Sequence, residues 1–228
     1  MLFLQHRNEV LVMGTYLNPG NSGFAEMLKT DYVDKTGLIS LINRTIGTKK
    51  KLTCISRPRR FGKSYAAQML CAYYDKTCDS QELFSEYKIA EDTLYKKHLN
   101  RYDVIYLDMT GIIGETSPDD IVAYIKRSVV NEIRTQYSEV NIEEGFAPTL
   151  VNLVNYSNDK IVMIIDEWDA PIRENPIIQS EYLEFLRSLF KNSGTTSKIF
   201  AAAYMTGILP IKKDGSQSAI SDFEEYSV

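Results

Sequence analysis

The sequence predicts an α/β fold of three layers, in which helices cover both faces of a mostly parallel sheet. Two segments carry this prediction: residues 51–74 place Gly-Lys-Ser between an apolar run and a helical pattern, and residues 160–167 end an apolar run in two acids. In addition, four apolar runs alternate with segments of helical periodicity, as buried parallel strands alternate with crossover helices. The four expected strands are Leu52–Ile55, Val104–Met109, Ile161–Ile165 and Ile199–Met205.

The segment RPRRFGKS at residues 57–64 has the layout of a phosphate-binding loop, because a strand precedes it and a helical pattern begins at Ser64. Backbone N–H groups can curl around an anion at such a loop, and the helix N-terminus adds partial positive charge. Gly62 allows the backbone to approach a phosphate closely. We expect Lys63 to reach the β- and γ-phosphates and the Ser64 hydroxyl to bind magnesium.

This loop departs from the usual pattern G-x-x-x-x-G-K-[ST], because Arg57 stands where the first glycine is expected. A basic turn between a strand and a helix is therefore the alternative. The flanking strand and helix favour a nucleotide site, and so does the acidic strand end about a hundred residues later. The arginines of the loop either add positive charge near the phosphates, contact acids of a neighbouring subunit or are solvated. The residues predicted to bind ATP in this segment are Arg57, Pro58, Arg59, Arg60, Phe61, Gly62, Lys63, Ser64 and Tyr65.

Asp166 and Glu167 stand at the carboxyl end of the apolar run 161–165. Ligands of α/β sheets bind outside the carboxyl ends of the strands. We therefore expect Asp166 to hold magnesium through a water, within one water-bridged contact of Ser64, and its strand to lie beside the phosphate-loop strand. Glu167 is expected to point toward the γ-phosphate and to orient or deprotonate an attacking water. The alternative is a buried strand that leaves the sheet at a polar turn.

Further positions near strand ends are candidates of the same site. Thr206 follows the run 199–205, where a polar residue senses the γ-phosphate in several ATPase lineages; a hydrogen-bonded strand-end hydroxyl is the alternative. Asp169 is either a second acid behind the site or a turn residue. Residues 192–194 are expected to stop the helix at 180–191. The tail, residues 212–228, is polar and is expected to be loop-like.

Composition and charge exclude several classes of function. The formal net charge of −4 argues against a domain whose whole surface binds nucleic acid, so direct nucleic-acid binding is not expected of this chain alone. Its three cysteines show no metal-ligand spacing, which argues against a structural zinc site, and reduced thiols fit a cytoplasmic protein. No stretch approaches the ~20 apolar residues that span a membrane, so no membrane partner is expected.

The chain is expected to form one domain over residues 13–228, with a lead-in segment at 13–50, a core at 51–211 and the tail at 212–228. Residues 1–12 are too short and too polar for a signal peptide. We interpret them as a non-native extension, with translation starting at Met13. A frayed N-terminal extension is the alternative.

Several stretches of the sequence resemble the bacterial AAA-ATPase-like domain family, whose P-loop proteins are often followed by a second domain similar to PD-(D/E)XK nucleases. The stretches are GTYLNPGNSGF, YVDKTGLI, SRPRRFGKSY, VIYLDMT, VMIIDEWDAPI and MTGILPIKKDGSQSAISDFEEYS. Arginine in place of the first glycine is itself typical of the family. The resemblance implies an AAA-like P-loop NTPase fold that binds ATP and Mg²⁺. It also implies phosphate and magnesium roles for Lys63 and Ser64, and Walker B roles for Asp166 and Glu167.

The stretches that match end before the nuclease-like domain, so we expect this chain to represent the ATPase part alone, as a fragment or truncated copy. The first hypothesis is an ATPase that hydrolyses Mg-ATP, with Lys63 and Glu167 as its catalytic residues. The second is a nucleotide-dependent switch or scaffold with little turnover, a truncated inactive copy included; a protein partner or homo-oligomer fits either. A P-loop kinase is the third, disfavoured because the sequence has no arginine-rich lid.

Overall fold

The computed structural model describes residues 13–191, 193–211 and 220–227. Five strands form one sheet in the order β2-β3-β4-β1-β5, and every neighbouring pair is parallel. The predicted parallel sheet is therefore confirmed, and the four predicted runs all belong to it. The strands are β1 (Leu52–Ser56), β2 (Asp103–Asp108), β3 (Ile161–Asp166), β4 (Phe200–Gly207) and β5 (Glu224–Ser227).

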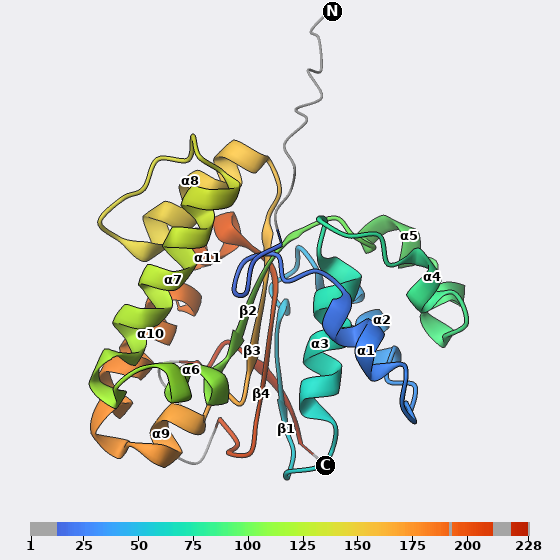
Figure 1. The fold of residues 1–228 in the computed structure, drawn as a ribbon, viewed down its shortest axis with the longest axis horizontal. Helices are drawn as coiled ribbons and strands as arrows, with labels where there is room; N and C mark the ends of the chain where they lie inside the picture. Colours follow the sequence, from blue (N-terminus) through green and yellow to red (C-terminus); the bar gives the residue numbers. More distant parts are fainter. Residues whose placement is uncertain (1–12, 192, 212–219, 228) are drawn as a thin grey trace, which may run out of the picture.

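Helices cover both faces of the sheet, which gives three layers (Figure 1). One face carries α1 (Ser22–Met27), α2 (Gly37–Thr45), α3 (Lys63–Tyr74), α4 (Gln81–Phe84) and α5 (Tyr95–His98). The other carries α6 (Met109–Glu115), α7 (Ile121–Gln136), α8 (Phe146–Ser157), α9 (Ala170–Glu174), α10 (Gln179–Phe190) and α11 (Ser193–Ile199). Single 3₁₀ turns lie at η1 (Lys88–Glu91), η2 (Pro118–Asp120) and η3 (Pro176–Ile178).

The apolar strands divide their side chains between two cores. In β3, Met163 and Ile165 pack into the core under α6–α11, whereas Val162 and Ile164 pack into the core under α1–α5. Alternation of side chains along a strand produces this division, and it requires apolar residues at consecutive positions. The continuous apolar run is therefore the sequence signal of a strand in the middle layer.

The expectation that β3 lies beside β1 is wrong, because β4 runs between them. In the register of the sheet, Thr206 of β4 is the partner of Ile55 on one side and of Asp166 on the other. The apolar pattern of a strand buried on both faces is the same whichever strands are its neighbours. The sequence therefore contains no local signal for this order.

The predicted loop-like tail is wrong for Glu224–Ser227, which form β5 beside β1. An edge strand has one neighbour and can carry polar side chains, so it lacks the apolar run that marks the inner strands. The helix predicted over 180–191 ends at Phe190, so it stops where expected, but the sequence missed a further helix, α11, at Ser193–Ile199, and β4 begins only at Phe200. Calls on residues 1–12, 212–219 and 228 lie outside the described residues.

Two exclusions made from the sequence can be compared with the structure. Within the described ranges, no helix combines the length and the apolar character that crossing a membrane requires. Cys54 and Cys71 are buried core residues, and Cys78 is half-buried. None of these thiols belongs to a group of metal-ligating side chains in the part of the chain that the structure describes.

Candidate functional site

The phosphate-binding loop connects the end of β1 to the start of α3, at the carboxyl edge of the sheet. Arg60 and Gly62 both have φ of 70°, in the left-handed region. Left-handed residues in a turn direct neighbouring N–H groups toward one side, which creates a concave site for an anion. Gly62 also stands directly before the first helical residue, Lys63, so the loop and the helix N-terminus face the same space.

Lys63 is buried beneath this loop. Its Nζ donates to the carbonyl oxygens of Arg57 at 3.1 Å and Pro58 at 3.0 Å. It also forms an ion pair with Glu167, with 3.0 Å between Nζ and Oε1. The two carbonyl bonds fix the ammonium at the base of the loop, and the ion pair joins the loop to the end of β3.

Glu167 belongs to a network that reaches the segment after β4. Its Oε2 lies 3.0 Å from Nη2 of Arg173, and Arg173 Nε donates to Asp169 Oδ2 at 2.8 Å. Asp169 is fully buried and accepts from the backbone N–H groups of Ile208 at 3.1 Å and Leu209 at 3.0 Å. Glu167 itself has φ of 52°, a conformation that side-chain-bearing residues adopt at a cost of about 1–3 kcal/mol and that clusters at functional sites. Asp169 is therefore more than a turn residue, since it supports the arginine that holds Glu167.

Asp166 has a strongly shifted pKa and lies near the loop. Burial raises the pKa of its carboxyl to about 6, the neighbouring Ser64 hydroxyl acts to lower it, and the charges of Asp108 and Glu167 raise it. Its Oδ1 is buried without a hydrogen-bond partner among the described residues. A buried carboxylate oxygen without a partner is costly unless a cation or donor satisfies it. The Ser64 hydroxyl lies close enough to act on this carboxyl, and their shared role at a metal ion stays a prediction.

These features fit a magnesium ion brought by a nucleotide. Hard oxygen ligands such as the Ser64 hydroxyl and the Asp166 carboxylate suit magnesium, which keeps several waters and phosphate oxygens as its other ligands. Within the described ranges, no group of three or more His, Cys, Asp or Glu side chains could hold a metal ion alone. The ion would therefore depend on the nucleotide for most of its coordination.

A cleft of about 650 Å³ opens over the loop. Its charged lining residues are Arg59, Arg60, Lys63, Asp108, Glu167, Arg173 and Glu174, and its other lining residues include Gly62, Ser64, Tyr65 and Thr110. The cleft thus offers cations of two different elements to one ligand, together with acids from the ends of β2 and β3. Its volume is in the range of small-molecule sites, about 300–1,000 Å³.

Other predicted site residues lie around the cleft rather than in its lining. Arg57 places its guanidinium 6.0 Å from the ring centroid of Phe61, and Pro58 contributes its carbonyl oxygen to Lys63. Thr206 is fully buried in β4. Arg57 is half-buried, whereas Arg59 and Arg60 are exposed and line the cleft. Of the three arginines, Arg59 and Arg60 are thus the ones whose side chains line the cleft.

Sequence reasoning missed four residues of the lining. Asp108 ends an apolar strand just as Asp166 does, so the rule that selected Asp166 also applies to Asp108, and Thr110 follows it. Arg173 and Glu174 lie on the short helix α9. The spacing of Asp169 and Arg173, i and i+4, could have indicated their pair, but not the pair of Arg173 with Glu167.

A family of proteins with the description "Predicted AAA-ATPase" matches residues 20–216. An uncharacterised protein in the vnfD 5′ region of Azotobacter chroococcum mcd 1 is 24% identical over 218 residues. That match covers 92% of this chain and 40% of the relative. The chain therefore spans less than half the length of this curated relative.

Solved structures also align with the chain. The ORC2 protein of Aeropyrum pernix, solved as ADPNP–ADP complexes, has 14% identity and a TM-score of 0.48, and the alignment covers 87% of this chain and 49% of that one. PCH-2 of C. elegans has 10% identity and a TM-score of 0.40, and the alignment covers 85% of this chain and 41% of that one.

Proposed function

Because the chain belongs to the family of predicted AAA-ATPases, we propose that it binds Mg-ATP in the cleft over residues 57–65 and hydrolyses its γ-phosphate. The observation that carries the proposal is the contact between Lys63 Nζ and Glu167 Oε1 at 3.0 Å. It joins the cation of the phosphate loop to the acid at the end of β3, so both lie where a terminal phosphate would sit.

Each residue then has a role that follows from its place. The N–H groups of the loop and of the first turn of α3 cradle the phosphates, and Lys63 contacts the β- and γ-phosphate oxygens. Ser64 and Asp166 hold the magnesium ion, which neutralises charge on the phosphates when bound. Thr206, at the end of β4 next to Asp166, remains the candidate for sensing the γ-phosphate.

Glu167 would orient the attacking water or take its proton. In the structure both of its carboxylate oxygens are engaged, one by Lys63 and one by Arg173. Phosphate oxygens that reach Lys63 compete for its ammonium and release one oxygen of Glu167 toward a water. Arg173 keeps the other oxygen and adds a second positive charge to the lining of the cleft.

The test is phosphate release by the Glu167→Gln variant. We expect it to bind ATP and to release phosphate about 10²–10⁴-fold more slowly than the wild type, the usual contribution of a general base. Glu174→Gln is the matched control, because Glu174 lines the same cleft and loses the same charge. Equal rates for Glu167→Gln and the wild type would remove Glu167 from the reaction.

The ion pairs of Glu167 with Lys63 and Arg173 also favour a second function, a nucleotide-dependent switch or scaffold with little turnover. Arg173 and Asp169 connect Glu167 to the backbone of Ile208 and Leu209, so a shift of Glu167 after its release from Lys63 would be passed through Arg173 to that segment. A wild type that binds ATP without measurable phosphate release would establish this alternative. A cytoplasmic location and a protein partner or homo-oligomer are part of either proposal.

A further inference from the structure

A second cavity lies at the opposite edge of the sheet, where the strands begin. It has a volume of about 530 Å³ and is lined by Lys49, Lys51, Lys160, Phe190, Ser197 and Asp222, among others. We call it the lysine pocket. Lys51 directly precedes β1, and Lys160 directly precedes β3. β1 separates the pocket from the phosphate loop by about 13 Å or more. The phosphate groups of one mononucleotide therefore cannot occupy both cavities.

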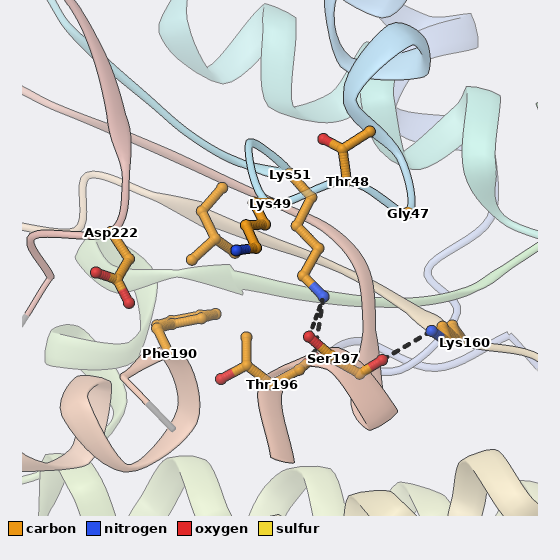
Figure 2. Close-up of a pocket in the computed structure, with 10 residues that line it drawn as sticks. Gly47, Thr48, Lys49, Lys51, Lys160, Phe190, Thr196, Ser197 and Asp222 are labelled. Carbon is orange, nitrogen blue, oxygen red and sulfur yellow. Dashed lines mark hydrogen bonds between the residues drawn. The ribbon is translucent and has the colours of Figure 1, made fainter. Parts of the chain in front are cut away.

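Two of the lysines converge on the C-terminal half of α11, as Figure 2 shows. Lys160 Nζ donates to the carbonyl oxygen of Ser197 at 2.7 Å. Lys51 Nζ lies 3.3 Å from Ser197 Oγ and 3.4 Å from the carbonyl oxygen of Thr196. The contacts of Lys51 are longer than the ordinary 2.7–3.2 Å of N–H···O bonds, and an ammonium has three donors. Lys51 thus has unused capacity to donate.

The charge of Lys51 has no acidic counterpart. The residue is 6% exposed, and no carboxylate of the described residues forms an ion pair with it. Burial, and next the charge of Lys160, lower the pKa of its ammonium. Asp222, the acid in the lining, stands on the far side of the pocket from Lys51 in Figure 2. A buried charge without a partner is costly, and the C-terminal carbonyls of α11 offset it only in part.

We propose that the lysine pocket binds a small anionic ligand that carries a phosphate or carboxylate group. The anion would lie against Lys51, with the Ser197 hydroxyl as a further donor and Lys49 as a second cation. Phe190 and Leu52 supply an apolar wall for the rest of the ligand. The near-complete burial of Lys51 favours a small molecule over the backbone of a nucleic acid, which binds exposed cations. This inference does not depend on the proposed ATPase activity.

The test uses the full chain with Lys63→Ala, so that the phosphate loop does not contribute. Inorganic phosphate and succinate are titrated separately by calorimetry at constant ionic strength. We expect binding of at least one anion, and a further Lys51→Met change should weaken it about tenfold or more, as loss of a charged hydrogen bond does. Tighter binding of phosphate assigns a phosphate-bearing ligand, and tighter binding of succinate assigns a carboxylate.

Lys50→Met is the matched control in the same background. Lys50 is adjacent in sequence, its side chain is 71% exposed and it pairs with Glu224 at 3.5 Å rather than lining the pocket. The Lys50→Met change removes the same charge as Lys51→Met, and the anion affinity should stay within about twofold of that of the Lys63→Ala protein. Absence of binding by the Lys63→Ala protein, or equal loss in the Lys50→Met and Lys51→Met proteins, would overturn the proposal.

A second measurement avoids dependence on the folding of Lys51→Met. In NMR spectra of the Lys63→Ala protein, the amides of Thr196 and Ser197 should shift during the anion titration. Amides of α7, which does not line the pocket, should stay in place. Unchanged signals at Thr196 and Ser197 under saturating anion would also overturn the proposal.

Discussion

Two buried lysines flank strand β1, and their surroundings differ. Lys63 follows the strand at the carboxyl edge, where it meets Glu167 at 3.0 Å and two loop carbonyls. Lys51 precedes the strand at the opposite edge, where it has two long contacts and no carboxylate partner among the described residues. Both are withdrawn from solvent, with the side chain of Lys63 5% exposed and the residue Lys51 6% exposed.

The difference teaches that the two edges of the sheet have distinct chemistry. Asp108, Asp166 and Glu167 stand together where strands end. Lys51 and Lys160 stand where β1 and β3 begin, an edge at which the acids Asp103 and Glu224 also begin β2 and β5. Only the carboxyl edge combines a cation with acids and an anion-binding loop, which phosphoryl transfer requires. In the lysine pocket, by contrast, neither Lys51 nor Lys160 forms an ion pair with the lining acid Asp222 or with another carboxylate of the described residues, which suits simple binding of an anion.

Among variants that leave Lys63 and Glu167 in place, Arg173→Gln should have the largest effect, because it breaks the ion-pair network that distinguishes the surroundings of Lys63 from those of Lys51. Glu167 then loses the partner of its Oε2, and the cleft loses a positive charge. Phosphate release should fall about 10²-fold, as on removal of one electrostatic stabiliser, while ATP binding changes far less. Arg101→Gln, an exposed arginine outside the cleft, is the control in the same assay. A rate equal to that of the control would show that Arg173 has no part in turnover.

Asp166→Asn tests the raised pKa of Asp166 at the carboxyl edge through the pH dependence of the free energy of unfolding. The folded pKa of Asp166 is about 6 against an ordinary value of 3.8. Between these values the folded protein holds a proton that the unfolded chain has released, so the wild-type free energy of unfolding falls as pH rises through this window. At pH 8, without metal or nucleotide, Asp166→Asn should be about 1–3 kcal/mol more stable than the wild type, because two pKa units correspond to about 3 kcal/mol.

The measurement is urea unfolding at pH 4 and pH 8. The advantage of Asp166→Asn should be present at pH 8 and absent at pH 4, where the wild-type carboxyl is largely protonated in the folded state. Asp222→Asn, which removes one exposed carboxylate near the amino edge, is the control for a loss of one charge in the same assay. Parallel curves for Asp166→Asn and the wild type would contradict a raised pKa.

A smaller effect is expected from alanine at two glycines of similar backbone conformation. Gly62 has φ of 70° at the carboxyl edge, and Gly47 has φ of 75° at the lysine pocket. A Cβ added at Gly62 would lie 3.0 Å from Cε of Lys35, the far end of a flexible side chain. A Cβ added at Gly47 would have no described heavy atom within 4 Å. Both variants should lose about 1 kcal/mol in urea unfolding, since alanine disfavours this conformation.

The two variants should differ in their affinity for ATP. Gly62→Ala should weaken ATP binding in a titration, because it alters the loop that approaches the phosphates, whereas Gly47→Ala should not. Equal ATP affinity in both variants would argue against contact between the phosphates and the loop.

Much of the fold could be predicted because its inner strands are apolar on both faces. The runs around Ile164 and Met205 stand out in the sequence for that reason. The edge strand β5 could not be found this way, since its Glu224 and Glu225 serve as partners of polar groups rather than as core: Glu225 Oε1 accepts from Ser56 Oγ at 2.9 Å. Helix α11 has glycine and two threonines, which are poor helix formers, and it relies on tertiary contacts.

The candidate site was predictable where it rests on local motifs and not where it rests on tertiary contacts. Lys63 and Asp166 stand in recognisable strand–loop patterns. The ion pair of Arg173 with Asp169 has the local i,i+4 spacing of a helix, which the sequence could have indicated, whereas its pair with Glu167 depends on how the turn after β3 places that residue. Likewise, nothing in the local sequence of Lys51 says that its ammonium is buried without an acid, because the lining of its pocket comes from distant segments.

The most direct measurement of the central claim is a calorimetric titration of Mg-ATP into the wild type, Lys63→Ala and Lys51→Ala. The account predicts one ATP per chain for the wild type and for Lys51→Ala. It predicts affinity at least about 100-fold lower for Lys63→Ala, since several charge-assisted bonds to phosphate are lost. Equal ATP affinity in Lys63→Ala and the wild type, or loss of binding in Lys51→Ala alone, would contradict a nucleotide site at the carboxyl edge.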